Sequence, residues 1–324
     1  MEIISNPTQV EIKKAAQALK DGHLVAFPTE TVYGLGADAT NEKAVSRVYA
    51  VKGRPTDHPL IVHISSINQL DKWATDIPGY AIKLAKEFWP GPMTLILKRS
   101  ELAKDFVTGS QESVGLRVPS NSVSLKLLAE FEELGGQGIA APSANRFGAV
   151  SPTSKDDVME ELELYLNTED QVLDGGKCPI GIESTIIDCT NSFPQVIRPG
   201  VITLEMVTSC VSIFSTTLTS NYQKKMPGTL DSHYAPKAQV NLWAEVKSGD
   251  GFIALSNVPT PDGAIRLISP NDLEEFARDL YEALRLADAQ KIMRISVVLP
   301  EGNGLAIAIR DRLIKSSAGT NSKK

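Results

Sequence analysis

The sequence has few cysteines and histidines, and this shortage excludes several kinds of site. Its 324 residues include only three cysteines, Cys178, Cys189 and Cys210, and none of them has CxxC spacing. So sparse and odd a count predicts reduced thiols in a cytosolic protein, not a disulfide framework or a zinc site. The four histidines are scattered along the chain, so no histidine-based metal cluster is visible.

Long apolar runs and excess positive charge are also missing. No apolar run approaches the roughly 18 to 20 residues that a membrane span requires. The polar, acidic start MEIISNPTQVEIKK does not resemble a signal peptide, so we expect a cytoplasmic protein without a membrane partner. The net charge of −6 argues against a generally basic nucleic-acid binder, although it leaves room for a local basic groove.

The distribution of apolar residues predicts an α/β protein with two domains. For residues 1–208 we expect a twisted mixed sheet with flanking helices, because helices and strands alternate there without a strict βαβ period. Residues 209–238 are rich in Ser, Thr, Pro and Gly, and we interpret them as a long linker. Residues 239–324 return to a strand-helix-strand-helix pattern, which predicts a small Rossmann-like domain.

The stretch FPTETVYGLGADA, residues 27–39, follows a short apolar strand. Gly34 and Gly36 formally match a dinucleotide fingerprint, but PTETVY separates them from the strand end, so the fit is poor. No GxxxxGK(S/T) motif occurs anywhere, which excludes a P-loop ATPase. We expect a turn, and its glycines would let backbone N–H groups approach the oxygens of a ligand.

Cations and hydroxyls gather on several predicted loops at strand ends. KGRP places Lys52 and Arg54 at alternate positions before the strand LIVHI, which contains His63. Further polar groups are Ser113, Arg117, Ser143, Asn145, Ser151, Ser184, Thr185 and Arg198. Taken singly, each has a structural explanation: a solvated surface, a hydrogen-bonded histidine, an elaborate turn. Together they suit a bound polyanion and a small polar substrate, and no Ser-His-Asp order suggests covalent catalysis.

Five motifs in order make the resemblance to a family specific. They are PTETVYGLG, KGRPxxxPLIVH, VGLRVP, PSANxxGxxSPT and GxESTIID with RPG, and together they resemble the YrdC family over about residues 10–205. The linker string PGTLDSHYAP and the small domain resemble the longer, two-domain form. The resemblance implies a nucleotidyltransferase that makes threonylcarbamoyl-AMP from L-threonine, bicarbonate and ATP, releasing pyrophosphate. Its product would serve threonylcarbamoyladenosine formation in tRNA, through a downstream transferase machinery.

The same resemblance implies roles for individual residues. The KxR and SxN pairs, expected to face the triphosphate and to be catalytic, are Lys52, Arg54, Ser143 and Asn145. The other residues implied on the ATP side are His58, Ser113, Ser151, Arg198, His233 and Tyr234. Those implied on the threonine side are Thr31, His63, Arg117, Ser184 and the backbone at Ala141. No protein metal ligand is assigned, and Mg²⁺ is expected on the ATP phosphates.

Two positions depart from the family pattern, and the linker carries a further expectation. His58 stands where the family often has Asn, and Ser113 where it often has Thr, so the nucleotide contact of His58 is less secure. His233 and Tyr234 are larger than a free tether needs, and we interpret 209–238 as a lid over the active site. The alternative is that they only dock the linker on the surface.

Two other functions compete with this interpretation. One is a module that binds double-stranded RNA or tRNA without catalysis, since the same cations would serve nucleic-acid phosphates. The negative net charge and the many hydroxyl residues argue against it, but weak RNA binding stays compatible with the sequence. The other is carbamoyl transfer in hydrogenase maturation, whose large proteins carry CxxC motifs and extra domains that this chain lacks.

Overall fold

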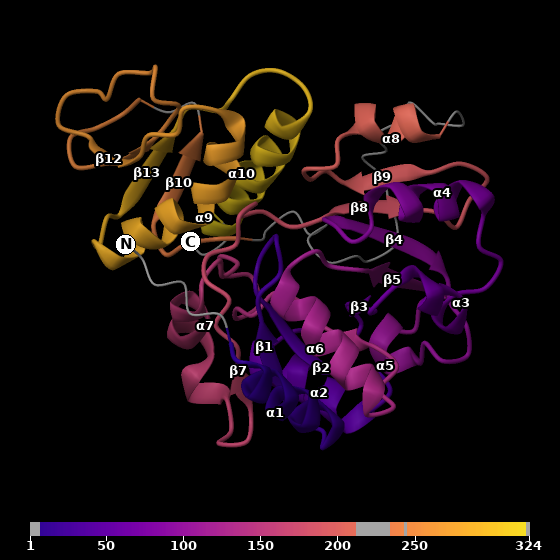
Figure 1. Cartoon of the computed structure of the whole chain (residues 1–324). Helices are drawn as coiled ribbons and strands as arrows, with labels where there is room; N and C mark the ends of the chain where they lie inside the picture. Colours follow the sequence, from indigo (N-terminus) through magenta and orange to yellow (C-terminus); the bar gives the residue numbers. More distant parts are fainter. Residues whose placement is uncertain (1–6, 212–233, 243–244, 322–324) are drawn as a thin grey trace.

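The computed structural model describes residues 7–211, 234–242 and 245–321, and two sheets organise them (Figure 1). The helices that accompany the larger sheet are α1 Gln9–Lys20, α2 Glu42–Lys52, α3 Leu70–Trp73, α4 Gly79–Phe88, α5 Asp105–Thr108, α6 Ser122–Glu133, α7 Lys155–Leu162 and α8 Leu204–Cys210. Short 3-10 turns lie at Ile67–Gln69 and Glu163–Tyr165. The strands are β1 Val25–Phe27, β2 Gly34–Asp38, β3 Ile61–His63, β4 Met93–Lys98, β5 Ser113–Arg117, β6 Ile139–Ala140, β7 Gln171–Val172, β8 Thr185–Asp188 and β9 Gln195–Arg198.

The larger sheet is mixed, as the sequence predicts. Within the described residues it has nine strands in the order β7-β1-β2-β6-β3-β5-β4-β8-β9. β3 pairs with β5 in parallel, while β4 pairs with β5 antiparallel and with β8 in parallel. This arrangement confirms the expected twisted mixed sheet with flanking helices.

The two faces of this sheet differ, and the difference positions the site. Side chains alternate between faces along a strand, so Val114 and Leu116 of β5 enter the main hydrophobic core. Ser113, Gly115 and Arg117 therefore lie on the opposite face. Helices α1 and α6, side by side in Figure 1, cover part of that second face with an apolar cluster of their own. In the middle of the second face, Ile61, Ile96 and Ile186 form a small apolar cluster, and the polar His63 and Arg117 lie next to it at the ends of β3 and β5.

The glycines of the opening motif lie in a strand, which corrects the expected turn. Gly34 and Gly36 belong to β2, which pairs antiparallel with β1. A Cβ at Gly36 would lie 2.6 Å from Ile139 Cγ2 and 2.8 Å from Phe27 Cε1. The glycines therefore serve close packing within the sheet. The turn itself is shorter and ends at Tyr33, whose hydroxyl donates to the carbonyl of Gly176.

The second sheet confirms the Rossmann-like expectation. Its strands are β10 Gln239–Leu242, β11 Gly251–Ile253, β12 Ile265–Ile268 and β13 Arg294–Val297, in the order β10-β13-β11-β12. All of its pairings are parallel. Helices α9 Leu273–Ala289 and α10 Leu305–Asn321 complete this small domain, drawn from orange to yellow in Figure 1.

The predicted boundaries between the domains stay predictions, with one detail added. Helix α8 continues past residue 208 to Cys210, so the regular structure of the first part runs slightly beyond the expected end. Most of the predicted linker, including His233, lies outside the described residues, and nothing here bears on its role as a lid. Tyr234 is described, and its side chain is 1% exposed.

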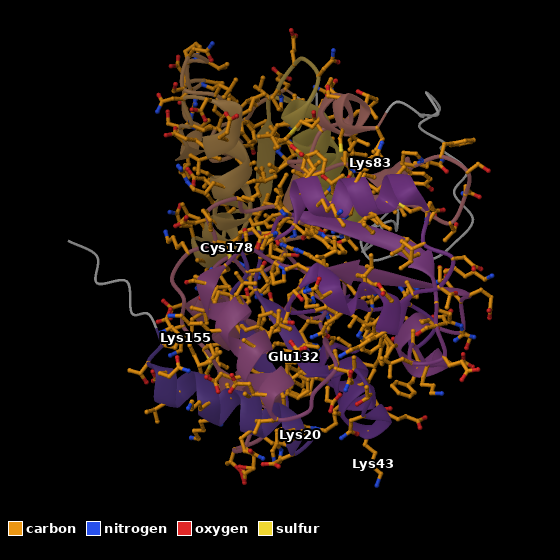
Figure 2. All side chains as sticks on the ribbon, turned by 45° about the vertical axis from the view of Figure 1, so that its right-hand side comes forward. Lys20, Lys43, Lys83, Glu132, Lys155 and Cys178 are labelled. Carbon is orange, nitrogen blue, oxygen red and sulfur yellow. The ribbon has the colours of Figure 1, made fainter. Side chains whose placement is uncertain are left out.

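The two domains share a hydrophobic cluster. Val32, Val150 and Ile182 of the large domain pack in one cluster with Tyr281 and other residues of α9 and α10. Lys43 is exposed and points away from the ribbon, whereas Cys178 lies within the molecule (Figure 2). All three cysteines are free thiols. No helix among the described residues has the length and apolar character that a membrane span requires.

Candidate active site

A pocket opens on the second face of the large sheet, and it collects residues from many segments. On the predicted threonine side, its lining contains Thr31, His63, Arg117, Ala141 and Ser184. On the predicted nucleotide side, it contains Arg54, Ser143, Arg198 and Tyr234. These segments are far apart in the sequence, and the strand order brings β3, β5, β8 and β9 close to one another.

Other predicted residues lie behind or beside this lining. Lys52, His58, Asn145 and Ser151 are buried near the same loops without lining the pocket. Ser113 lies four positions from Arg117 on the same face of β5, which is roughly 13 Å along a strand. Its hydroxyl is buried and has no hydrogen-bond partner among the described residues.

Arg117 is held in place by the opening motif. Its Nη2 donates to Glu30 Oε1 at 2.6 Å and to Thr31 Oγ1 at 3.0 Å. The other oxygen of Glu30 accepts the backbone N–H of Ser120 at 2.9 Å. The Arg117 side chain is 5% exposed, and its Nε has no partner among the described residues. Glu30, which sequence reasoning left without a role, therefore orients the guanidinium.

His63 lies beside Arg117, since the two residues are paired in the register of β3 and β5. Burial, and then the neighbouring Arg117 charge, lower the pKa of His63 to about 3. The ring packs edge-on against Phe27 with centroids 5.8 Å apart. Its Nδ1 is buried with no partner among the described residues. Near neutral pH the pocket thus presents an uncharged imidazole.

Arg54 brings a second guanidinium to the pocket from the loop after α2. Its Nη2 donates to the carbonyl of Pro59 at 3.2 Å, and the guanidinium lies 5.6 Å from the centroid of the Phe147 ring. Burial lowers the pKa of Arg54 to about 10, so the side chain remains charged near neutral pH. Its Nε also lacks a partner among the described residues.

Lys52 supports the pocket wall from behind. The side chain is 2% exposed, and its ammonium donates to the backbone carbonyls of Ser143 and Asn145. Burial, followed by the Arg54 charge, lowers the pKa of Lys52 well below its usual value. Asn145 adds to this support, because its Nδ2 donates to the carbonyls of Arg146 and Ala149. The KxR and SxN motifs therefore meet directly.

Arg198 and Ser184 form the opposite wall. Arg198 Nε and Nη2 donate to the Ser184 carbonyl at 3.0 and 2.8 Å, and Nη2 also contacts the Ser184 hydroxyl at 3.0 Å. The Ser184 hydroxyl lies 2.8 Å from the hydroxyl of Thr94. Arg198 is buried, and burial lowers its pKa from the usual value.

Glu183 is a pocket residue to which sequence reasoning gave no role. Its Oε1 accepts the Ser151 hydroxyl at 2.6 Å, and its Oε2 accepts Tyr281 at 2.9 Å and Arg312 Nε at 2.7 Å. Burial favours the neutral acid, but the charges of Arg312 and Arg198 and the Ser151 hydrogen bond overcome it and lower the pKa to about 2. GxES in the motif was the only local signal.

The chemistry of the lining points to an anionic ligand. Buried polar groups in proteins are nearly always hydrogen-bonded, so each exception requires an explanation. Arg54 Nε, Arg117 Nε and His63 Nδ1 are such exceptions, and all three residues line the same pocket. Among the described residues, no three His, Cys, Asp or Glu side chains are grouped so that they could hold a metal ion. The site suits phosphate or carboxylate oxygens instead.

Fold and pocket together define an α/β protein that binds a compact anionic substrate, and comparisons with known proteins identify the family. A family model described as "Telomere recombination" matches residues 17–200, and one described as "Threonylcarbamoyl-AMP synthase, C-terminal domain" matches residues 202–318. The chain therefore belongs to the threonylcarbamoyl-AMP synthase family. This confirms the resemblance to the YrdC family in its two-domain form.

Individual relatives agree over nearly their full length. The threonylcarbamoyl-AMP synthase of Pyrococcus abyssi is 38% identical, with 95% of this chain and 94% of the relative covered. That of Bacillus subtilis is 36% identical, with 98% and 95% covered. The crystal structure of Pyrococcus abyssi Sua5 complexed with L-threonine superposes with a TM-score of 0.85 at 36% identity, covering 98% of this chain and 96% of that one. These findings support an enzyme over an RNA-binding module.

Proposed function

We propose that this chain makes threonylcarbamoyl-AMP from L-threonine, bicarbonate and ATP, with release of pyrophosphate. The observation that carries the proposal is the pocket lined by Arg54, His63 and Arg117, each of which has a buried nitrogen without a partner among the described residues. Two guanidinium groups and a neutral imidazole suit phosphate and carboxylate oxygens. The names of the family relatives supply the particular acid, L-threonine.

The reaction needs no nucleophile from the protein. The threonine amine adds to bicarbonate and, with loss of water, gives a carbamate. A carbamate oxygen then attacks the α-phosphorus of ATP, the bond to the β-phosphate oxygen breaks, and pyrophosphate leaves. The protein has to align the reactants and stabilise the charge that develops on the phosphates. The scarcity of reactive groups in the pocket agrees with this chemistry.

On the threonine side, Arg117 is the group that we assign to the carboxylate. Glu30 holds its Nη2 and so orients the whole guanidinium, whose Nε has no partner among the described residues. Thr31, His63 and Ser184 line the same part of the pocket, together with Ala141. Because the pKa of His63 is lowered to about 3, the ring adds a hydrogen-bonding group without a competing positive charge.

On the nucleotide side, Arg54, Ser143 and Arg198 are assigned to the triphosphate. Lys52 and Asn145 act through the Ser143 loop, since Lys52 donates to its backbone. The other residues assigned to ATP by family resemblance are His58, Ser113, Ser151, His233 and Tyr234. Ser113 lines a separate pocket with Lys98 and Thr190, so its assignment rests on the family resemblance alone.

Magnesium is proposed to accompany the ATP phosphates. The pocket offers guanidinium and hydroxyl donors, and the described residues contain no metal-binding cluster, so the donor set fits phosphate oxygens and not a bare cation. When bound to the phosphates, Mg²⁺ would offset part of their charge. The product is proposed to pass to a tRNA threonylcarbamoyl transferase machinery in the cytoplasm, and weak direct RNA binding stays a prediction.

Pyrophosphate release tests the proposed function. The protein is incubated with ATP, Mg²⁺ and bicarbonate, and with each amino acid in turn. We expect release to require both L-threonine and bicarbonate. Serine lacks one methyl, worth about 0.8 kcal/mol on burial, so serine should react only several-fold more slowly. Equal release without any amino acid would refute the proposal.

A further inference from the structure

Glu183 connects the two domains at the edge of the pocket. Its carboxylate accepts one hydrogen bond from Ser151 of the large domain, and one each from Tyr281 on α9 and Arg312 on α10. Arg312 Nη2 also lies 3.4 Å from the Glu183 backbone carbonyl. The Arg312 side chain is 0% exposed and that of Glu183 is 8% exposed.

The partners of this carboxylate leave it little freedom. A buried charge needs both an opposite charge and hydrogen bonds, and losing one partner is costly because the other is left unpaired. Ser151 is bound to one carboxylate oxygen, and the small domain binds the other. The direction in which the carboxylate points, and hence the position of the Ser151 hydroxyl, is therefore set by α9 and α10.

Through its backbone, Glu183 also adjoins the pocket wall that Ser184 and Arg198 form. Ser184 follows Glu183 directly, and its carbonyl and hydroxyl contact Arg198. Tyr234, which also lines the pocket, stacks on Tyr281 with ring centroids 5.6 Å apart, and the Arg312 guanidinium lies 5.4 Å from the Tyr234 centroid. Tyr281 and Arg312 of the small domain thus contact both Glu183 and Tyr234, and Glu183 in turn binds Ser151.

We propose that Tyr281 and Arg312 are positioning residues for the reaction, and that the small domain acts on the site by holding Glu183, Ser151 and Ser184 in their working arrangement. This inference rests on the proposed function, and it gives the small domain a defined part in that function. Neither residue touches the reacting atoms. Both act through the Glu183 carboxylate.

The first test is Tyr281→Phe, which removes one hydroxyl and keeps the ring stacked on Tyr234. A hydrogen bond to a charged group is worth about a factor of ten or more. We expect kcat/KM to fall roughly tenfold for both ATP and L-threonine, because Ser184, assigned to threonine, lines the pocket and Ser151, assigned to ATP, is buried beside it. The matched control is Glu282→Gln, the next residue on α9, which loses a different contact between the domains, to Lys177 at 2.9 Å. It should stay within twofold of the wild type.

The second test grades the charge at residue 312. Arg312→Lys keeps a cation near Glu183, whereas Arg312→Met keeps only the apolar stem. We expect kcat/KM in the order wild type, Lys, Met, with part of the activity retained by the lysine variant. Should Arg312→Met not fold, Tyr281→Phe alone decides the question.

Two readouts separate this inference from the proposed function. L-threonine affinity, measured by calorimetry without ATP, should fall in Tyr281→Phe and not in Glu282→Gln. A crystal structure of Tyr281→Phe needs no substrate, and it should show the Glu183 carboxylate displaced from its 2.6 Å contact with Ser151. If the wild type is active while Tyr281→Phe matches it in kinetics, the inference is wrong and the proposed function stands. If the wild type is inactive, the crystal structure still tests the inference. A Glu183 carboxylate that keeps its contact with Ser151 in Tyr281→Phe then overturns it.

Discussion

At the residue scale, the pocket depends on side chains whose protonation is decided by burial, and His63 gives the clearest test. Its pKa is lowered from 6.5 to about 3 by burial and by Arg117. Between those pH values the unfolded chain binds a proton that the folded chain does not, so the free energy of unfolding should fall as the pH drops from 6.5 toward 3. His63→Gln should make the free energy of unfolding less dependent on pH in this range. The measurement is the urea midpoint as a function of pH.

A half-exposed histidine provides the control for that measurement. His23→Gln replaces a partly buried histidine outside the pocket, so it controls for the substitution itself. Identical slopes for His63→Gln and wild type would show that His63 does not resist protonation in the folded protein.

Lys52 is the residue whose position differs most from its expected role, and this changes its predicted effect. Lys52→Met keeps the apolar stem but removes the donor to two buried carbonyls. Lys52 acts on the pocket through the Ser143 loop, and a hydrogen bond to a charged group is worth about a factor of ten or more, so we expect turnover to fall roughly tenfold. The unpaired carbonyls should also lower the free energy of unfolding by about 1 to 3 kcal/mol.

Lys43 on the same helix offers the comparison. It is exposed and points away from the ribbon (Figure 2), so Lys43→Met should change neither pyrophosphate release nor the urea midpoint measurably. Wild-type turnover in Lys52→Met would remove Lys52 from the mechanism.

How much of the site the sequence predicts depends on how far apart along the chain the interacting residues lie. Arg54, Arg117 and Arg198 stand in short motifs with hydroxyl residues nearby, so the residue types and their spacing predict an anion-binding site. Glu183 is different, because its two small-domain partners lie 98 and 129 residues away. A pairing over such separations is created by the docking of two domains, and no local pattern in the sequence encodes it.

At the scale of elements, β2 shows what close packing demands of a strand. At Gly36 an added Cβ would lie 2.6 Å from Ile139 and 2.8 Å from Phe27, so Gly36→Ala should overpack the sheet. Overpacking of this kind costs about 1 to 3 kcal/mol, measurable as a lower urea midpoint. Gly79→Ala at the start of α4 meets nothing within 4 Å, so it should be neutral or slightly stabilising. Equal midpoints for the two variants would contradict this account.

The same strand marks the limit of reading elements from the sequence. Apolar residues at helical spacing predict helices over residues 8–21, 122–134 and about 271–288, and α1, α6 and α9 agree closely with these spans. GLGAD has two glycines and no alternation of apolar and polar residues, so it suggests a turn. It forms a strand because β1 and β6 pair with it on both sides, which is a tertiary effect.

At the scale of the whole molecule, the shared cluster around Val32, Val150 and Ile182 should make the two domains unfold together. Apolar side chains from both domains are buried against each other, so neither domain can open without exposing part of this cluster. Differential scanning calorimetry of the wild type should therefore show one transition.

Gly181 is where this cooperativity can be broken. Its φ is +80°, and an added Cβ would lie 2.3 Å from the backbone carbonyl of Arg278 on α9, so Gly181→Ala cannot keep the small domain in place. Backbone atoms of a long helix cannot yield as a flexible side chain would, so α9 has to move as a unit. We expect two calorimetric transitions in place of one, together with reduced pyrophosphate release because Tyr281 moves with α9. Gly249→Ala has a similar φ of +85° with nothing within 4 Å, so it isolates backbone strain, about 1 to 2 kcal/mol, and should keep one transition. A single transition in both variants would show that the domains do not depend on this contact.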